Sequence, residues 1–232
     1  REGADEPLGI ILSMEGADPI VWPEQIHSWK EDGLRVVGLS HYGISAYAHG
    51  TGTEGGLLPS GKILLGEMEK AGIILDVTHL ADQAFLEAID AFGGPLLASH
   101  SNCRTLVPGQ RQFDDDHLQT IISRGGVIGA ALDAWMLQPN WVRGETTNEN
   151  LTLEAVADHI DHVCQLAGNS LHAAVGSDLD GGYGTEQTPR DLDTIADLQK
   201  IPGLLKKKGY SQEDISSIMH GNWIRFFREA WS

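Results

Sequence analysis

The amino-acid sequence predicts an α/β fold built on a parallel sheet, and three observations support this prediction. Short apolar runs recur along the chain, and none alternates strictly between apolar and polar residues. Continuous apolar character is typical of strands whose two faces are both covered, as in parallel sheets. Amphipathic segments lie between the runs, and ionisable residues follow most of them. Repetition of strand, helix and strand indicates right-handed βαβ units.

Six apolar runs are predicted to be strands and four amphipathic segments to be helices. The strands are residues 8–14, 35–40, 73–78, 95–99, 126–132 and 173–177, and the helices are 61–71, 80–92, 115–124 and 153–167. The first and last helices are expected to end at Gly72 and Gly168, because glycine readily adopts the left-handed conformation that follows a helix. The Gly-rich segment 42–59 is long for a connection, which is typical of a functional loop such as a lid.

A (β/α)8 barrel of the TIM type explains the position of the ionisable residues most simply. Five of the six runs end in such a residue, namely Glu15, His41, His79, His100 and Asp178. In a barrel the carboxyl ends of all strands point to one rim, where catalytic residues gather. No Gly-x-Gly-x-x-Gly or Walker-type loop follows any run, which weakens nucleotide-binding interpretations. Only six strands are visible, whereas a closed barrel of this type has eight.

Length, charge and cysteine content narrow the range of functions. A chain of 232 residues without repeats or linkers suits one continuous domain, residues 1–232. Its formal net charge of −17 argues against nucleic acid or an anionic lipid surface as a partner. No apolar run is long enough to span a bilayer. The two cysteines form no CxxC motif, so neither a disulfide framework nor a thiolate zinc site is indicated.

His79 and His100 end consecutive predicted strands and are candidate metal ligands. Adjacent parallel strands lie about 4.8 Å apart, so the two imidazoles can converge on one ion. Glu15 ends another strand and can supply a carboxylate oxygen from across the rim. Two histidines and one glutamate with an open position form a known catalytic zinc set. The alternative is that each histidine only caps its strand through a hydrogen bond to the backbone, and the pattern alone leaves both open.

Two further charged residues are candidates for contact with a substrate. Asp178 is interpreted as a general base and acid that faces the metal, with an acidic turn as the alternative. Arg111 suits a substrate carboxylate held bidentately, although a surface arginine is the simpler reading without other information. His159 and His162 fall within a predicted helix and are interpreted as part of a solvated face. Cys103 has no obvious activating partner.

An ordered series of segments carries a family resemblance. The segments are Glu15-Gly16, Gly38-Leu-Ser-His41, Gly55-Gly-Leu-Leu-Pro59, Asp76-Val-Thr-His79-Leu80, Ala98-Ser-His100-Ser-Asn102, Arg104, Arg111, Arg124-Gly-Gly-Val-Ile-Gly129, Asp158-His-Ile-Asp-His162, Gly176-Ser-Asp-Leu-Asp-Gly181 and Gly221-Asn-Trp-Ile-Arg225. Together they resemble the membrane (renal) dipeptidase family of zinc peptidases, family M19. The resemblance extends from the first predicted strand to the C-terminus.

The resemblance implies a barrel of the metallo-dependent hydrolase kind that holds two zinc ions. Glu15 is expected to be the carboxylate that bridges both ions. His79 and His100 are expected to complete the shell of the second ion. The implied activity is hydrolysis of the peptide bond of small dipeptides by metal-activated water.

The resemblance also implies roles for three residues toward the dipeptide. His41 is expected to hold the scissile carbonyl or the oxyanion that develops from it. Arg111 is expected to bind the C-terminal carboxylate of the substrate. Asp178 is expected to contact the amino end and to carry the proton to the leaving amine.

One departure from the family concerns the N-terminal region. Family members carry a His-x-Asp pair at the end of the first strand, which supplies the remaining ligands of the first zinc ion. Nothing before Glu15 matches that pair, and the first two strands of the barrel are absent too. We expect that the chain, which starts at Arg1 without an initiator Met, lacks an N-terminal portion of the working protein. A shortened relative is the alternative.

A zinc-dependent dipeptidase is therefore the predicted function, and two alternatives stay open. A related amidohydrolase would use the same metal site on another carboxylate-bearing amide, such as a β-lactam. A non-catalytic homologue that lost the first metal would keep at most one zinc ion and hydrolyse nothing. The resemblance suggests a homodimer, but no stretch identifies an interface, and the compartment stays unknown.

Overall fold

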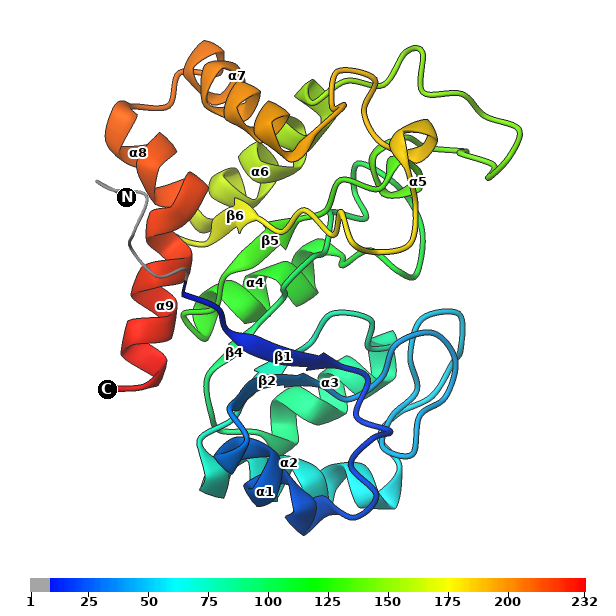
Figure 1. Cartoon of the computed structure of the whole chain (residues 1–232), viewed down its shortest axis with the longest axis vertical. Helices are drawn as coiled ribbons and strands as arrows, with labels where there is room; N and C mark the ends of the chain where they lie inside the picture. The colour runs from blue at the N-terminus through cyan, green and yellow to red at the C-terminus, as the bar shows by residue number, and fades with distance from the viewer. Residues whose placement is uncertain (1–8) are drawn as a thin grey trace.

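The computed structural model describes residues 9–232, and each of the six predicted strands has a counterpart in it (Figure 1). Residue 8, where the first predicted run begins, lies outside the described residues. The strands are β1 (Leu12–Glu15), β2 (Leu34–Gly38), β3 (Ile74–Asp76), β4 (Leu96–Leu97), β5 (Ile128–Ala130) and β6 (Ala173–Val175). Each is shorter than its apolar run. Beside β2 to β6, residues that flank the hydrogen-bonded ladder are buried as well, whereas Ile10 and Ile11 before β1 are exposed.

The paired strands are parallel and follow one another in chain order. One sheet has the order β1-β2-β3-β4, and a second pairs β5 with β6. A parallel bridge between Ala98 and Ile128 joins the two sheets. There the N–H of Ala98 donates to the carbonyl of Val127 at 3.0 Å, and the N–H of Gly129 donates to the carbonyl of Ala98 at 2.9 Å. The predicted parallel α/β architecture is confirmed for the described residues.

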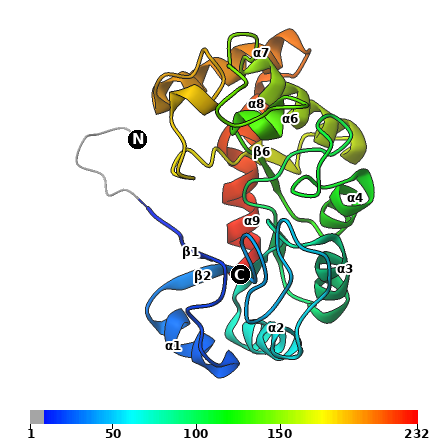
Figure 2. The same cartoon turned by 90° about the vertical axis from the view of Figure 1, so that its right-hand side faces the viewer.

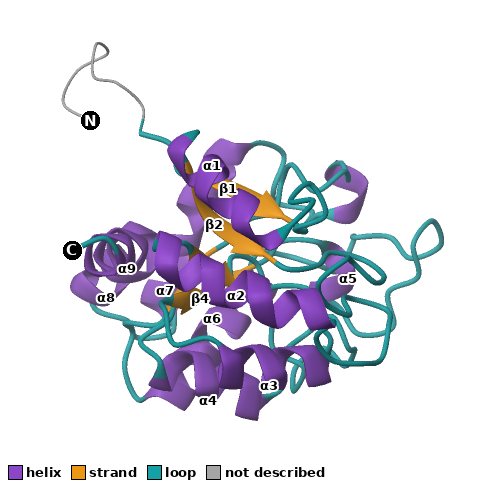
Figure 3. Cartoon of the chain, turned by 90° about the horizontal axis from the view of Figure 1, so that it is seen from below, coloured by secondary structure: helices purple, strands orange, loops and turns teal. Residues whose placement is uncertain are grey.

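Helices follow the strands and surround them (Figure 3). Up to residue 167 they are η1 (Pro23–Gln25), α1 (Ile26–Glu31), α2 (Pro59–Ala71), α3 (Asp82–Ala91), α4 (Asp115–Ser123), α5 (Ala134–Leu137) and α6 (Glu154–Ala167). The four predicted helices correspond to α2, α3, α4 and α6. Gly72 and Gly168 end the first and last of these with φ of 65° and 67°, as predicted.

The C-terminal part adds helices that no pattern predicted. They are η2 (Thr185–Gln187), η3 (Ile195–Lys200), α7 (Ile201–Lys207), α8 (Gln212–Ser216), the π-helical turn η4 (Ser217–Gly221) and α9 (Asn222–Ala230). Helix α9 lies where the strands start, at their amino ends (Figure 1), and so behind them in the view of Figure 2. Asn222 anchors it, since its side-chain amide donates to the carbonyls of Ser170 at 2.7 Å and Ala173 at 2.8 Å. Among residues 9–232, no helix combines the length and apolar character needed to cross a membrane.

Consecutive residues of the strands are buried in two different apolar clusters. The smaller cluster contains Val36, Ile74, Leu97, Val127, Ala174 and Phe226, the last from α9. The residues next to the strand members, Val37, Leu75, Leu96, Ile128 and Ala173, belong to the larger cluster, which includes the apolar faces of the surrounding helices. Both faces of strands β2 to β6 are therefore covered, which explains why their apolar runs do not alternate with polar residues, whereas Leu12 of β1 is exposed.

The Gly-rich segment 42–59 is tied to the rest of the fold. Isolated bridges pair Tyr42 with Thr51 and Ala48 with Leu57 within it. Tyr47 is 1% exposed, and its hydroxyl donates to the carbonyl of Ile20. These contacts give no support to the expected lid, and they hold the segment beside the carboxyl ends of β2 and β3.

Candidate active site

Glu15, His79 and His100 bring three donor atoms together at the carboxyl ends of three strands. Glu15 ends β1, and the histidines come shortly after β3 and β4. Oε1 of Glu15 lies 3.1 Å from Nε2 of His79 and 3.1 Å from Nε2 of His100, and the two Nε2 atoms are 3.3 Å apart. Within the described part of the chain, these residues form a group that could hold a metal ion.

The spacing and protonation of these donors suit a metal ion. Metal–ligand bonds of about 2.0–2.1 Å place neighbouring ligand atoms of a tetrahedron about 3.3 Å apart, close to the separations in this triad. Burial lowers the pKa of His79 to about 3, so its ring is neutral, which is the form that binds metals. Hydrogen bonds, foremost that with His100, hold the pKa of Glu15 below its usual range and keep the carboxylate ionised.

A hydroxyl group lies against the other ring nitrogen of each histidine. Oγ1 of Thr51 is 2.9 Å from Nδ1 of His79, and Oγ of Ser99 is 2.8 Å from Nδ1 of His100. Partners of this kind fix the ring orientation and leave Nε2 available for the ion. Sequence reasoning missed Thr51, because it lies 28 residues before His79 in the Gly-rich segment and no local pattern connects them.

His79 and Asp178 both have backbone conformations that are rare for residues other than glycine. Their φ angles are +69° and +56°. Such conformations cost on the order of 1–3 kcal/mol and cluster at functional sites, where the surrounding structure holds them. The strain therefore supports a functional role for both residues.

His41 and Asp178 flank the triad on two sides. Nε2 of His41 is 3.9 Å from Oε1 of Glu15, and its ring packs edge-on against His79 with centroids 4.4 Å apart. Oδ1 of Asp178 lies 3.9 Å from Nε2 of His100. Burial raises the pKa of Asp178, which favours a carboxyl group that can accept and release a proton.

Arg111 is 4% exposed, so the surface-arginine reading of the sequence is wrong. Its Nη2 donates to the carbonyl of His100 at 2.8 Å, and Nη1 lies 3.3 Å from Oγ of Ser101. Burial lowers the pKa of Arg111, but an arginine remains charged. A guanidinium has five N–H donors, so several remain for a ligand. Arg111 lines one cavity of about 350 Å³ together with the other five residues predicted for the site.

His159 is 2% exposed in the structure, so the solvated-face interpretation is wrong for this residue. Its Nδ1 accepts a hydrogen bond from the N–H of Cys103 at 3.0 Å. Burial lowers the pKa of His159 to about 4 and raises the pKa of Cys103, so the imidazole and the thiol are both neutral. His159 thus anchors the segment between His100 and Arg111 from α6.

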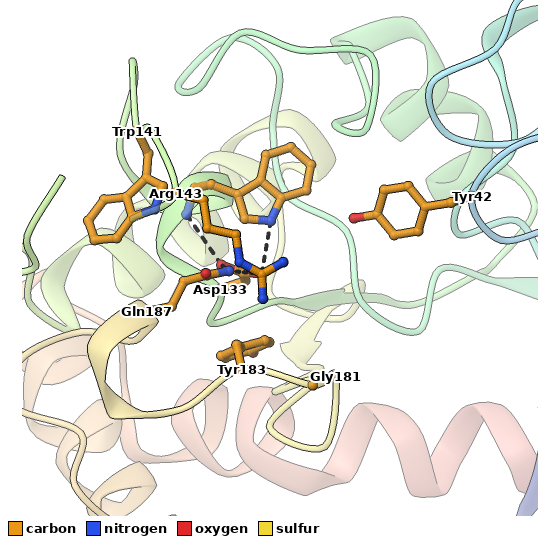
Figure 4. A pocket seen from close by; sticks show the side chains of 9 residues that line it. Tyr42, Asp133, Trp141, Arg143, Gly181, Tyr183 and Gln187 are labelled. Carbon is orange, nitrogen blue, oxygen red and sulfur yellow. Dashed lines mark hydrogen bonds between the residues drawn. The ribbon is translucent and has the colours of Figure 1, made fainter. Parts of the chain in front are cut away.

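Asp133 is a site residue that sequence reasoning missed. It directly follows the fifth predicted run, residues 126–132, which is the one run that was not assigned an ionisable residue. Its oxygens accept hydrogen bonds from Nε2 of Gln187 at 2.8 and 3.0 Å and from Nε1 of Trp135 at 2.8 Å. Asp133 and Trp135 line both the cavity of the triad and a neighbouring one of about 410 Å³ (Figure 4).

Solved structures with a similar fold include a metallo peptidase and a probable dipeptidase. A metallo peptidase from Rhodobacter sphaeroides, liganded with a phosphinate mimic of the dipeptide L-Ala-D-Ala, superimposes with a TM-score of 0.83 and 26% identity over 95% of this chain and 63% of that chain. The probable dipeptidase PvdM from Pseudomonas aeruginosa has the same fold, with a TM-score of 0.85, 23% identity, and coverage of 95% of this chain and 69% of that one. The Rhodobacter metallo peptidase implies a metal cofactor.

Sequence relatives and a family match agree with the structural neighbours. Dipeptidase tcpJ of Claviceps purpurea is 30% identical over 85% of this chain, which spans 45% of that dipeptidase. Dipeptidase verJ of Clonostachys rogersoniana is 31% identical over 94% of this chain, which spans 54% of that protein. The chain thus covers about half the length of these two relatives. Residues 1–232 match the sequence model of the membrane dipeptidases, and the chain therefore belongs to the membrane dipeptidase family, peptidase family M19.

Proposed function

We propose that the protein is a zinc-dependent dipeptidase. One observation carries the proposal, which is that the Glu15, His79 and His100 triad shares a cavity with the buried cation Arg111. A metal site beside a carboxylate-binding cation suits the hydrolysis of a short peptide with a free C-terminus. The names of the relatives, and the dipeptide mimic bound to the Rhodobacter enzyme, support this substrate class.

The six parallel strands are proposed to belong to a (β/α)8 barrel in the whole protein. Their succession in chain order, the helices around them and the gathering of site residues at their carboxyl ends support this arrangement. Residues 1–232 would all belong to this one domain. As in other barrels, the loops at this rim would then provide the substrate cavity.

Zinc is the ion proposed for the triad. A glutamate and two histidines match a known donor set of catalytic zinc, and their spacing suits tetrahedral coordination. The family resemblance further implies a second zinc ion, with Glu15 bridging the two. A bound zinc ion would lower the pKa of a water molecule toward neutrality and polarise the scissile carbonyl.

The remaining residues are proposed to bind the dipeptide and move its proton. Arg111 binds the C-terminal carboxylate through its free N–H groups. His41 donates a hydrogen bond to the oxygen of the scissile carbonyl as negative charge develops there, a contribution typically worth a few kcal/mol. Asp178 contacts the amino end of the substrate, takes the proton from the attacking water and delivers it to the leaving amine.

The test combines zinc content with hydrolysis by the full-length gene product. Elemental analysis and dipeptide hydrolysis are measured for the wild type, for His100→Gln and for His162→Gln, a histidine outside the cavity. We expect the first variant to lose zinc and activity and the second to keep both. Zinc-loaded protein that opens a β-lactam but leaves dipeptides intact would instead identify a related amidohydrolase. Protein without zinc and without hydrolysis would be a binding homologue.

A further inference from the structure

We propose that the second cavity binds the side chain of the substrate's amino-terminal residue, and that Arg143 and Trp141 select an acidic side chain there. The inference rests on the proposed dipeptidase function and adds the class of dipeptide. The cavity has a volume of about 410 Å³, which is ample for one side chain. It adjoins the cavity of the triad, because Asp133, Trp135 and Gly181 line both.

Three segments from distant parts of the chain form this second cavity (Figure 4). Tyr42 comes from the Gly-rich segment 42–59, Trp141 and Arg143 come from the segment after α5, and Tyr183 comes from the segment after β6. The segment after β6 also contains Asp178, which the proposed function places at the amino end of the dipeptide. A side chain that enters this cavity would therefore belong to the amino-terminal residue.

The acidic residue of the cavity already has its partners in the protein. Asp133 is 7% exposed, and Gln187, its principal partner, is 6% exposed. Both carboxylate oxygens accept a hydrogen bond from Nε2 of Gln187, and Oδ2 also accepts one from Nε1 of Trp135. The backbone N–H of Trp135 lies 3.4 Å from Oδ1. Asp133 therefore has little capacity left to accept hydrogen bonds from a cationic side chain.

Two of the unused polar groups of the cavity can only donate hydrogen bonds. The indole Nε1 of Trp141 is buried and has no partner among the described residues. Arg143 is exposed at the cavity, and its side chain makes no hydrogen bond or ion pair with residues 9–232. An indole N–H and a guanidinium can only donate, so the group that satisfies them must be an acceptor. A carboxylate is an acceptor of this kind, and it also pairs with the charge of Arg143.

The charge of Asp133 makes the selection depend on Arg143. With Arg143 present, an acidic side chain meets a cation as well as the buried carboxylate of Asp133. Without Arg143, the same side chain meets the like charge of Asp133 with no cation beside it, which disfavours binding. The aromatic faces of Trp135, Trp141 and Tyr183 can cover the methylene groups of either an acidic or a neutral side chain.

The experiment compares Glu-Ala with Gln-Ala, which differ in charge but hardly in shape. The zinc-loaded, full-length protein is assayed for kcat/KM on both dipeptides, and binding of the matching phosphinate mimics is measured by calorimetry. The variants are Arg143→Met, Trp141→Phe and the control Arg228→Met, an exposed arginine of α9. Ala-Glu and Ala-Gln test whether the effect belongs to the amino-terminal residue.

We expect the wild type to prefer Glu-Ala over Gln-Ala by about tenfold, the worth of one charge-assisted contact. Arg143→Met should abolish this preference. Trp141→Phe should lower kcat/KM for both dipeptides by about threefold through one lost hydrogen bond. Arg228→Met should change neither the preference nor kcat/KM. An unchanged ratio in Arg143→Met, or a change confined to Ala-Glu and Ala-Gln, overturns the inference while leaving the dipeptidase proposal intact. Absence of hydrolysis and of mimic binding in the wild type would overturn both.

Discussion

Oδ1 of Asp76 accepts a hydrogen bond from the N–H of Ser99 at 3.1 Å, and the same atom accepts one from the N–H of Thr78 at 3.0 Å. Asp76 ends β3, and Ser99 comes shortly after β4, so one oxygen joins the ends of two neighbouring strands. Thr78 directly precedes His79, and Ser99 directly precedes His100. A single carboxylate that is 9% exposed thus positions the backbone before both candidate histidine ligands.

Replacing Asp76 with alanine should weaken zinc binding and destabilise the fold. The substitution leaves two inward N–H groups without an acceptor, which costs about 2–5 kcal/mol. Loss of a group that orients metal ligands typically lowers metal affinity by about 10–100-fold. Zinc affinity is measured by competition with a chromophoric chelator, and stability by urea unfolding. Asp76→Asn keeps an oxygen at the same place and should retain most of the zinc affinity and most of the stability. Equal losses in the two variants would contradict the idea that this oxygen positions the backbone before the histidines.

Thr51→Val should weaken zinc binding without a large loss of stability. Valine has nearly the shape of threonine but cannot pair with Nδ1 of His79, so the imidazole loses the contact that fixes its orientation. We expect a loss of zinc affinity of about tenfold. Thr53→Val is the matched control, because its hydroxyl donates to the carbonyl of Gly50 in the same loop and touches no candidate ligand. Equal zinc affinities for the wild type and Thr51→Val would show that the Thr51 hydroxyl does not orient His79 for the metal.

Strands β2 to β6 could be predicted from the sequence because burial on both faces requires consecutive apolar residues. Residues 73–75, for example, are Ile-Ile-Leu, and Ile74 and Leu75 pack in different clusters. The helices beyond residue 195 were not among the predicted elements, although α9 is strongly amphipathic. Asn222 anchors α9 to carbonyls about 50 residues earlier in the chain, and no local pattern contains that contact.

In the site, too, residues placed by a local pattern could be predicted, and contacts between distant residues could not. Glu15, His79 and His100 were recognisable because each follows its own strand, and parallel strands bring such positions together. The burial of Arg111 and His159 was not recognisable. Arg111 donates a hydrogen bond to the carbonyl of His100, in the same segment, and His159 accepts one from the N–H of Cys103, which is distant in the sequence. Such pairings follow no periodic pattern in the sequence.

Arg111→Met should affect substrates according to whether they carry a free carboxylate. Methionine fills much of the buried volume but cannot donate hydrogen bonds or pair with an anion. We expect kcat/KM for a dipeptide to fall by about 100-fold, the loss of a bidentate charged contact worth about 3 kcal/mol. The C-terminal amide of the same dipeptide should lose far less. Full kcat/KM of the variant on the free dipeptide would exclude the carboxylate contact, and a zinc assay of the variant checks that His100 keeps its position.

The buried His159 should make the stability of the metal-free protein depend on pH. Its pKa is about 4 in the folded chain, where burial disfavours the charged ring, against about 6.5 in the unfolded chain. Between these values the unfolded chain binds a proton that the folded chain does not. The free energy of unfolding should therefore fall as the pH is lowered from about 6.5 toward 4, by up to about 3 kcal/mol, and His159 adds no pH dependence above this window. His159→Gln keeps an acceptor for Cys103 but cannot titrate. Urea unfolding at several pH values should give a smaller slope for the variant than for the wild type; parallel curves for the two would mean that His159 is not a source of the dependence.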